Sequence, residues 1–154
     1  MDGSVALSLV AVVVSIVAVV FAGYQARLLA QQTRIQQAVA ESSFNLELAA
    51  QLDSVLTRIA ADPNAYTHVW GNVAPKDRPQ DNRIGDVLTQ ALGDVIDRAL
   101  AASERLPGFA LNQSDWEAFA DNVLDHSAAL REATETFSWW FFLRRRLDAR
   151  RTTT

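Results

Sequence analysis

One uninterrupted apolar stretch, residues 5–21, constrains this chain more than any other feature. It reads VALSLVAVVVSIVAVVF, and no charged residue occurs between Asp2 and Arg27. A helix that crosses the hydrocarbon core of a bilayer needs about 20 predominantly apolar residues. The sequence therefore predicts a transmembrane anchor over residues 4–26, with the lipid bilayer as its first partner.

The residues on either side of this stretch indicate an uncleaved anchor and its orientation. A secretory signal peptide has a basic n-region and a shorter apolar core, whereas this chain begins Met-Asp-Gly. Cleavage is the alternative, because residues 20–22 read Val-Phe-Ala. Arg27 and Arg34 follow the stretch, so the positive-inside rule places the N-terminus outside the cell membrane and the C-terminal domain in the cytoplasm. Tyr24 and Arg27 are then expected at the membrane interface.

Small residues occupy one face of the predicted anchor. Small side chains let two helices approach closely in a bilayer, where no hydrophobic effect drives association. The pattern predicts self-association through the transmembrane helix. The alternative is that alanine and serine are common and stand out against valine. The stripe has spacings of four, three, four, three and four residues, and consists of Ser4, Ser8, Ala11, Ser15, Ala18 and Ala22.

The helix is expected to continue beyond the anchor into a stalk over residues 27–43. Residues 25–40 contain neither proline nor glycine and mix good helix formers with glutamine. Ser42-Ser43 is a candidate kink or new helix start. A sparse apolar seam with spacings of seven, four and seven residues is typical of a short coiled coil, and consists of Leu28, Ile35, Val39 and Leu46.

Residues 44–137 are predicted to fold as one all-α domain, a small bundle of about four to five helices. Apolar residues recur at the helical period over residues 44–61 and 84–106, and strand alternation is absent. The second of these helices has a wide apolar face, which begins with Ile84 and Val87 and suits burial against several partners. Helix starts are predicted at Asp62-Pro63, at a capping box of Ser114 and Glu117, and at Ser127.

Residues 138–154 are predicted to form a membrane-proximal tail. Aromatic residues are followed directly by arginines, a composition typical of segments in the headgroup region of a bilayer. Near an anionic leaflet each arginine adds about 1 kcal/mol of attraction. The alternative is that the aromatic side chains complete the core of the domain and the arginines are solvated. The residues predicted to contact the membrane are Trp139, Trp140, Phe141, Phe142, Arg144, Arg145 and Arg146.

Charge is distributed asymmetrically along the chain. Residues 41–135 contain 16 Asp and Glu against seven Lys and Arg, a net charge of −9. Residues 144–151 contain five Arg against Asp148, a net charge of +4. The acidic body is a poor match for nucleic acid, and the basic end can attract an anionic surface.

No motif for catalysis, cofactor binding or metal binding stands out. The chain has no cysteine, and its two histidines, His68 and His126, form no H-x-x-x-H pattern. Glu117, Asp121 and Asp125 lie four residues apart and would share a helix face, where solvated carboxylates are commoner than a cation site. We therefore predict neither enzyme nor cofactor. A membrane-bound hydrolase that uses His126 or Asp121 is an alternative.

The order of these features resembles that of uncharacterised bacterial single-pass membrane proteins grouped in families of unknown function. The sharpest shared element is Asp62-Pro63, followed by Tyr66 and then Val69-Trp70-Gly71. The resemblance covers most of residues 5–140, as an order of segments more than as a motif. Relatives often carry a Ser-Pro pair near the last helix, where this chain has Ser127-Ala128. The resemblance implies a membrane-tethered helical domain and no known activity or site.

These features predict a membrane-anchored interaction or accessory module without catalysis. Its cytoplasmic domain would be held at the inner leaflet, to bind an unknown protein partner or to report on the membrane. A different class of function is a small homo-oligomeric pore, with the Ser/Ala stripe facing its lumen. The candidate protein interface consists of three aromatic residues, for which core packing is the alternative role: Tyr66, Trp70 and Trp116.

Overall fold

The computed structural model is all-helical over the residues that it describes, with no strand among them. It describes residues 3–71, 82–106, 109 and 113–152, with side chains from residue 18 on. The predicted all-α class is confirmed over these ranges. The helices described there are α1 (Gly3–Ala61), α2 (Pro63–Trp70), α3 (Arg83–Arg105), α4 (Gln113–His126), α5 (Ala128–Thr136) and α6 (Phe141–Arg151).

The chain divides into two compact units, residues 1–40 and residues 41–154. Helix α1 runs from Gly3 to Ala61 without the break considered at Ser42-Ser43. Most of the apolar stretch predicted to cross the membrane, up to residue 17, lies outside the described side chains. None of the helices among the described residues combines the length with the apolar character that a membrane-spanning segment requires.

Two helix starts follow the sequence chemistry. The Asp62 carboxylate accepts backbone N–H bonds from residues 64 and 65 at 2.9 and 3.3 Å, and Pro63 takes the first position of α2. Proline suits this position because it has no N–H to leave unpaired. Ser127 caps α5, since its Oγ accepts the N–H of Leu130 at 3.0 Å. Both predicted caps are confirmed.

The start of α4 differs from the prediction. Helix α4 begins at Gln113, so Ser114 lies within its first turn and is not the N-cap. Glu117 does not complete a capping box. Its carboxylate instead accepts a hydrogen bond from Gln113 Nε2 at 2.7 Å and pairs with Arg146 on α6. A long-range ion pair has replaced the local cap.

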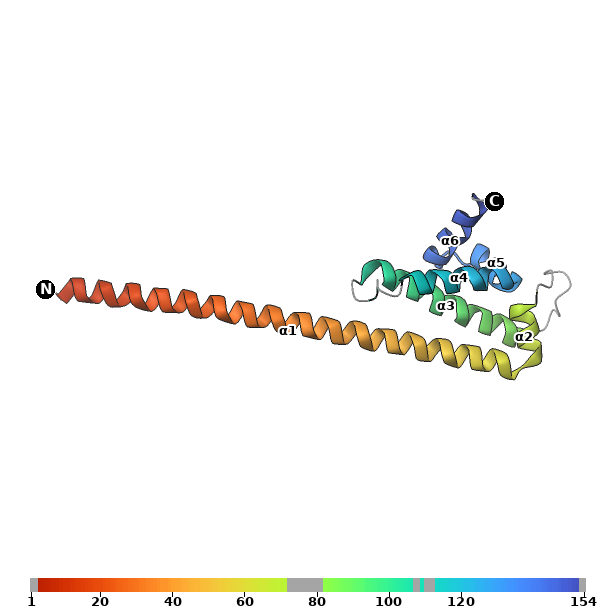
Figure 1. Ribbon diagram of the computed structural model, residues 1–154, viewed down its shortest axis with the longest axis horizontal. Coiled ribbons are helices and arrows are strands. Elements are labelled where there is room, and N and C mark those ends of the chain that lie inside the picture. Colours follow the sequence, from red (N-terminus) through yellow and green to blue (C-terminus); the bar gives the residue numbers. More distant parts are fainter. Residues whose placement is uncertain (1–2, 72–81, 107–108, 110–112, 153–154) are drawn as a thin grey trace. The chain divides into compact units, whose positions relative to one another are not determined.

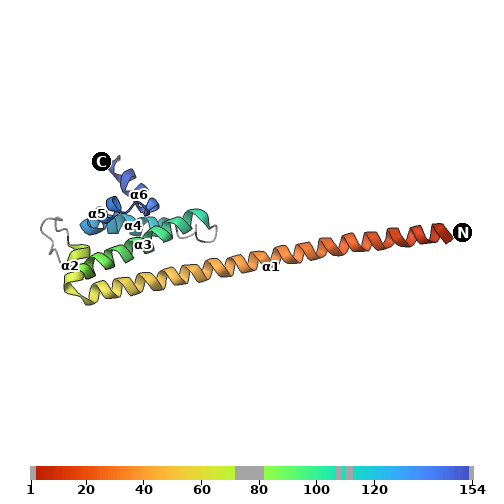
Figure 2. The same ribbon diagram turned by 180° about the vertical axis from the view of Figure 1, so that it is seen from behind.

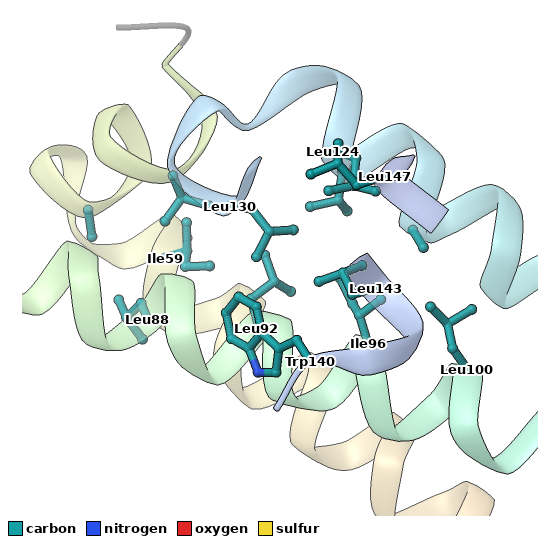
Figure 3. Close-up of a cluster of buried hydrophobic side chains, with 14 residues drawn as sticks. Ile59, Leu88, Leu92, Ile96, Leu100, Leu124, Leu130, Trp140, Leu143 and Leu147 are labelled. Carbon is teal, nitrogen blue, oxygen red and sulfur yellow. The ribbon is translucent and has the colours of Figure 1, made fainter. Parts of the chain in front are cut away.

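Helix α3 forms the centre of the second unit. In both views it lies between the C-terminal part of α1 and the group of α4, α5 and α6 (Figures 1 and 2). Its apolar face supplies much of the core, as the sequence predicted. Figure 3 shows side chains from several helices converging on this core, among them Ile59, Leu92, Ile96, Leu124, Leu130, Trp140, Leu143 and Leu147.

Helix α6 is part of this core, in agreement with the alternative in which the C-terminal aromatic side chains complete the domain. Its N-cap residue, Trp140, is only 1% exposed, and the indole N–H donates to Asp94 Oδ1 at 2.6 Å. A Cβ atom on Gly93 would lie 2.2 Å from the Trp140 ring. The indole therefore fits here because glycine has no side chain. Residues on α3 therefore dictate where α6 begins.

The first turn of α6 is capped from a distant part of the chain. The Trp140 side chain makes no capping hydrogen bond. Asp97 on α3 substitutes for it, because its Oδ1 accepts the N–H of Leu143 at 2.8 Å. A carboxylate at a helix N-terminus satisfies an orphan donor and interacts favourably with the helix dipole. Burial nevertheless raises the pKa of Asp97, since desolvation disfavours its charged form.

Candidate functional site

A groove lies between the C-terminal part of α1 and α3, both in the second unit. One section of about 400 Å³ is lined by Arg58, Arg83, Ile84, Val87 and Leu88. A second section of about 450 Å³ is lined by residues 47–58 of α1 and residues 91–98 of α3. Arg58 lines both sections, so the two are adjacent, and we call them together the α1–α3 groove.

The apolar end of this groove consists of residues that the sequence predicted to be buried. Ile84 and Val87 are 59% and 64% exposed, whereas their neighbour Leu88 faces the core. Sequence reasoning missed them as functional candidates. The sequence held a signal for their exposure. The row of residues on their side of α3 continues from Val87 with spacings of four, three and four residues, through Ala91 to the charged residues Asp94 and Arg98. A row of helix positions that ends in charged residues indicates a solvent-exposed side of the helix.

The two ends of the groove differ in charge. Arg58 and Arg83 flank the apolar end, while Glu47, Asp94 and Arg98 give the other end mixed charge. From Arg83 to Arg98 the α3 side of the groove is about 22 Å long at 1.5 Å per residue. This length, with an exposed apolar ridge and flanking cations, suits an amphipathic helix with carboxylates beside its apolar face.

The three aromatic residues predicted as a protein interface have different environments. Tyr66 on α2 is exposed. Trp70 and Trp116 are half-buried and pack against the core. The Trp116 ring is stacked on that of Phe109, with centroids 6.4 Å apart, and meets Phe119 edge-on. Core packing therefore accounts for Trp70 and Trp116, and none of the three lines the α1–α3 groove.

The residues predicted to contact the membrane are also divided. Trp140 is a core residue, and Phe142 is half-buried against the core. Trp139 and Phe141 are exposed, and the Trp139 ring stacks on Phe137 with centroids 4.7 Å apart. Four further predicted membrane contacts are exposed: Tyr24, Arg27, Arg144 and Arg145. Of the Ser/Ala stripe, Ala18 and Ala22 are exposed, and the remaining members lie outside the described side chains: Ser4, Ser8, Ala11 and Ser15.

Two arginines of α6, Arg146 and Arg150, pair with the acidic face of α4. Arg146 donates from Nε and Nη2 to Asp121 at 2.8 and 2.7 Å, and its Nη1 lies 2.8 Å from Glu117. Arg150 bridges Asp121, at 3.1 Å, and Asp125. These bonds lower the pKa of Asp121, chiefly through its hydrogen bond with Arg146. Through Arg146 and Arg150, the three carboxylates of α4 thus hold α6 on α4.

The opposite pKa shifts of Asp121 and Asp97 predict opposite effects of acid on stability. Because the folded pKa of Asp121 is lowered, its stabilisation is present above the unfolded pKa and is lost as pH falls through the folded pKa. The pKa of Asp97 is raised, so its contribution becomes more favourable as pH falls through that value. In urea unfolding between about pH 7 and 3, Asp121→Asn should flatten the acid-side decline and Asp97→Asn should steepen it. Shifts of the same sign would contradict this assignment.

A separate polar cavity of about 220 Å³ has three apolar lining residues, Ala129, Ala133 and Phe137, and its polar lining consists of His68, Asp86, Thr89, Glu132 and Thr136. His68 Nε2 lies 3.1 Å from Asp86 Oδ1, and the imidazole is buried. Both threonine hydroxyls donate to backbone carbonyls four residues earlier. His68 and Asp86 join α2 to α3, and this structural role accounts for their contact.

No group of three or more His, Asp or Glu residues among the described residues is placed to hold a metal ion. His126 is exposed, and its Nδ1 lies 2.8 Å from the Asn122 carbonyl oxygen. No protein-family model, curated protein or solved structure is detectably similar to this chain. The resemblance to single-pass bacterial proteins of unknown function stays a prediction.

Proposed function

We propose that this protein is a membrane-anchored interaction module, without catalysis, whose helical domain binds an amphipathic helix of a partner protein in the α1–α3 groove. The observation that carries the proposal is the exposure of Ile84 and Val87 beside Arg58 and Arg83. Exposed apolar patches rimmed by polar residues are typical of interaction sites. The arginines favour a partner with acidic residues beside its apolar face.

The membrane part of this proposal is supported by the sequence. Residues 5–21 form an uncharged apolar stretch of the length that a bilayer requires, and Arg27 and Arg34 follow it. With the anchor in the cell membrane and its positive flank inside, the domain that contains the groove lies at the inner leaflet. A partner is then sought among proteins that reach this leaflet.

The proposal predicts a partner-specific cross-link at Val87. A photoreactive benzoylphenylalanine is introduced at position 87, or at Ala118 on the exposed face of α4 as a matched control. After irradiation of living cells of the source organism, the Val87 variant should give a discrete heterologous adduct in the membrane fraction. The Ala118 variant should not give it. Because Arg58 lines both sections of the groove, Arg58→Glu should reduce the adduct about tenfold, the factor that corresponds to about 1.4 kcal/mol.

Two results would contradict separate parts of the proposal. Release of the protein from membranes by alkaline carbonate would contradict the anchor. Equal adducts at positions 87 and 118, or an adduct unaffected by Arg58→Glu, would contradict the docking groove. Circular dichroism of the Arg58→Glu protein controls for its folding, and since Arg58 is exposed its helical content should not change.

A further inference from the structure

The first unit contains a long stretch of helix whose described side chains are all exposed. From residue 18 to residue 40, every side chain is exposed. In proteins most of the stability of a helix comes from packing an amphipathic face, and isolated helices are marginal in water. The exposed apolar side chains that this helix offers for such packing include Leu28, Ile35 and Val39, at 43%, 56% and 59% exposure.

These residues follow a heptad repeat. Written as abcdefg with Val39 at a, the register places Phe21, Leu28 and Ile35 at successive d positions. The other a positions of the described stretch are Ala18, Gln25 and Gln32. A seven-residue repeat at a and d is the pattern of a left-handed coiled coil, in which the seam faces a second helix in the same register. Position Leu46 continues the a series in the sequence.

The two glutamines at a positions fit an identical partner. In a parallel homodimer each a residue faces its own copy, so Gln25 faces Gln25 and Gln32 faces Gln32. A carboxamide both donates and accepts hydrogen bonds, and it is therefore complementary to itself. A polar residue at a also fixes the register and oligomeric state of a coiled coil, at some expense of stability.

The residues that flank the seam fit an identical partner as well. Charged side chains at e and g normally set the choice of partner in coiled coils. Here the two charged residues of the stretch, Arg27 and Arg34, fall at c, as does Glu41 directly after it. The e and g positions hold Ala22, Tyr24, Leu29, Gln31, Gln36 and Ala38. Two copies in parallel therefore bring no like charges together.

We infer that residues 18–40 pair with the same segment of a second copy of this chain as a parallel, in-register coiled coil. The orientation rests on the proposed function, because two anchors in one membrane hold their helices parallel. The identity of the partner rests on the seam, the glutamines and the uncharged flanks. Each dimer at the membrane would then present two α1–α3 grooves, one from each copy of the chain.

A cysteine scan of the full chain in mild detergent tests this pairing. The natural chain has no cysteine, so each introduced thiol is alone. Disulfides form only between Cα atoms less than about 7 Å apart, which favours seam positions that face each other. Mild oxidation should give about tenfold more dimer for Leu28→Cys, Ile35→Cys and Val39→Cys than for the f positions, Ala30→Cys and Gln37→Cys.

A charge placed in the seam provides the second test. Ile35→Glu puts two carboxylates opposite each other at d and should lower dimer formation by Leu28→Cys about tenfold. Gln37→Glu adds the same charge at f and should leave it unchanged. Equal yields around the helix, dimers only at f, or no dimer at any position would overturn the inference. The outcome is independent of the Val87 cross-link and of carbonate extraction, which test the proposed function.

Discussion

Replacement of Trp140 by alanine is expected to remove about 3–5 kcal/mol from the free energy of unfolding, the range for truncation of a buried aromatic side chain. The indole is 1% exposed and meets the ring of Phe137 edge-on, with centroids 4.9 Å apart. Its truncation also removes the hydrogen bond to Asp94. Since small domains are stable by only about 5–15 kcal/mol, this loss should unfold a large fraction of the domain under mild denaturation.

Trp139 provides the matched control for this experiment. It is the same residue type, one position earlier, and it is exposed. Trp139→Ala should cost less than about 1 kcal/mol, because the side chain is exposed and stacks on the ring of Phe137. Urea unfolding of the full chain in detergent, followed by circular dichroism, measures both variants. Equal losses for Trp139 and Trp140 would contradict the assignment of Trp140 to the core.

The second large effect is expected at Gly93, and its sign is informative. In an exposed helix interior, alanine is more stable than glycine by about 1 kcal/mol. At position 93 the added Cβ would lie 2.2–2.7 Å from three carbon atoms of the Trp140 ring. Overpacking of this kind typically costs about 1–3 kcal/mol, so Gly93→Ala should destabilise the domain despite its better helix propensity.

A double variant separates the clash from other effects. Trp140→Phe removes the outer ring atoms that the new Cβ would meet, so Gly93→Ala should cost clearly less in that background. Gly23 serves as the control glycine, because a Cβ there meets nothing within 4 Å. Gly23→Ala should not reduce stability. Additive losses for the Gly93 and Trp140 variants would show that the two positions are not coupled.

The helical class and several boundaries could be predicted from sequence because they depend on local chemistry. Asp62 and Ser127 cap helices through atoms two or three residues away, and both caps are present. The period of apolar residues identified α3 and most of its buried face. Where a residue has a distant competitor, as Glu117 has in Arg146, the local prediction failed.

The C-terminal aromatic and basic residues show that composition alone does not decide between a membrane interface and a protein core. Tryptophan beside arginine is typical of a membrane interface, and the same residues can complete a core. The choice for α6 depended on Gly93, which leaves room for the indole, and on Asp97, which caps the helix. Both residues lie more than 40 positions earlier in the chain. Neither contact has a local sequence pattern.

The sequence by itself determined the helical class, the uncharged apolar stretch, the heptad register and the absence of cysteine, since each depends on composition or on residues within a few turns. Tertiary structure decided that Trp140 is buried while Trp139 is not, and that Arg146 binds Asp121. It also decided that Ile84 and Val87 stay exposed at the α1–α3 groove. The physical reason is that burial and ion pairing depend on which helices meet, and the partners of α3 come from distant parts of the chain.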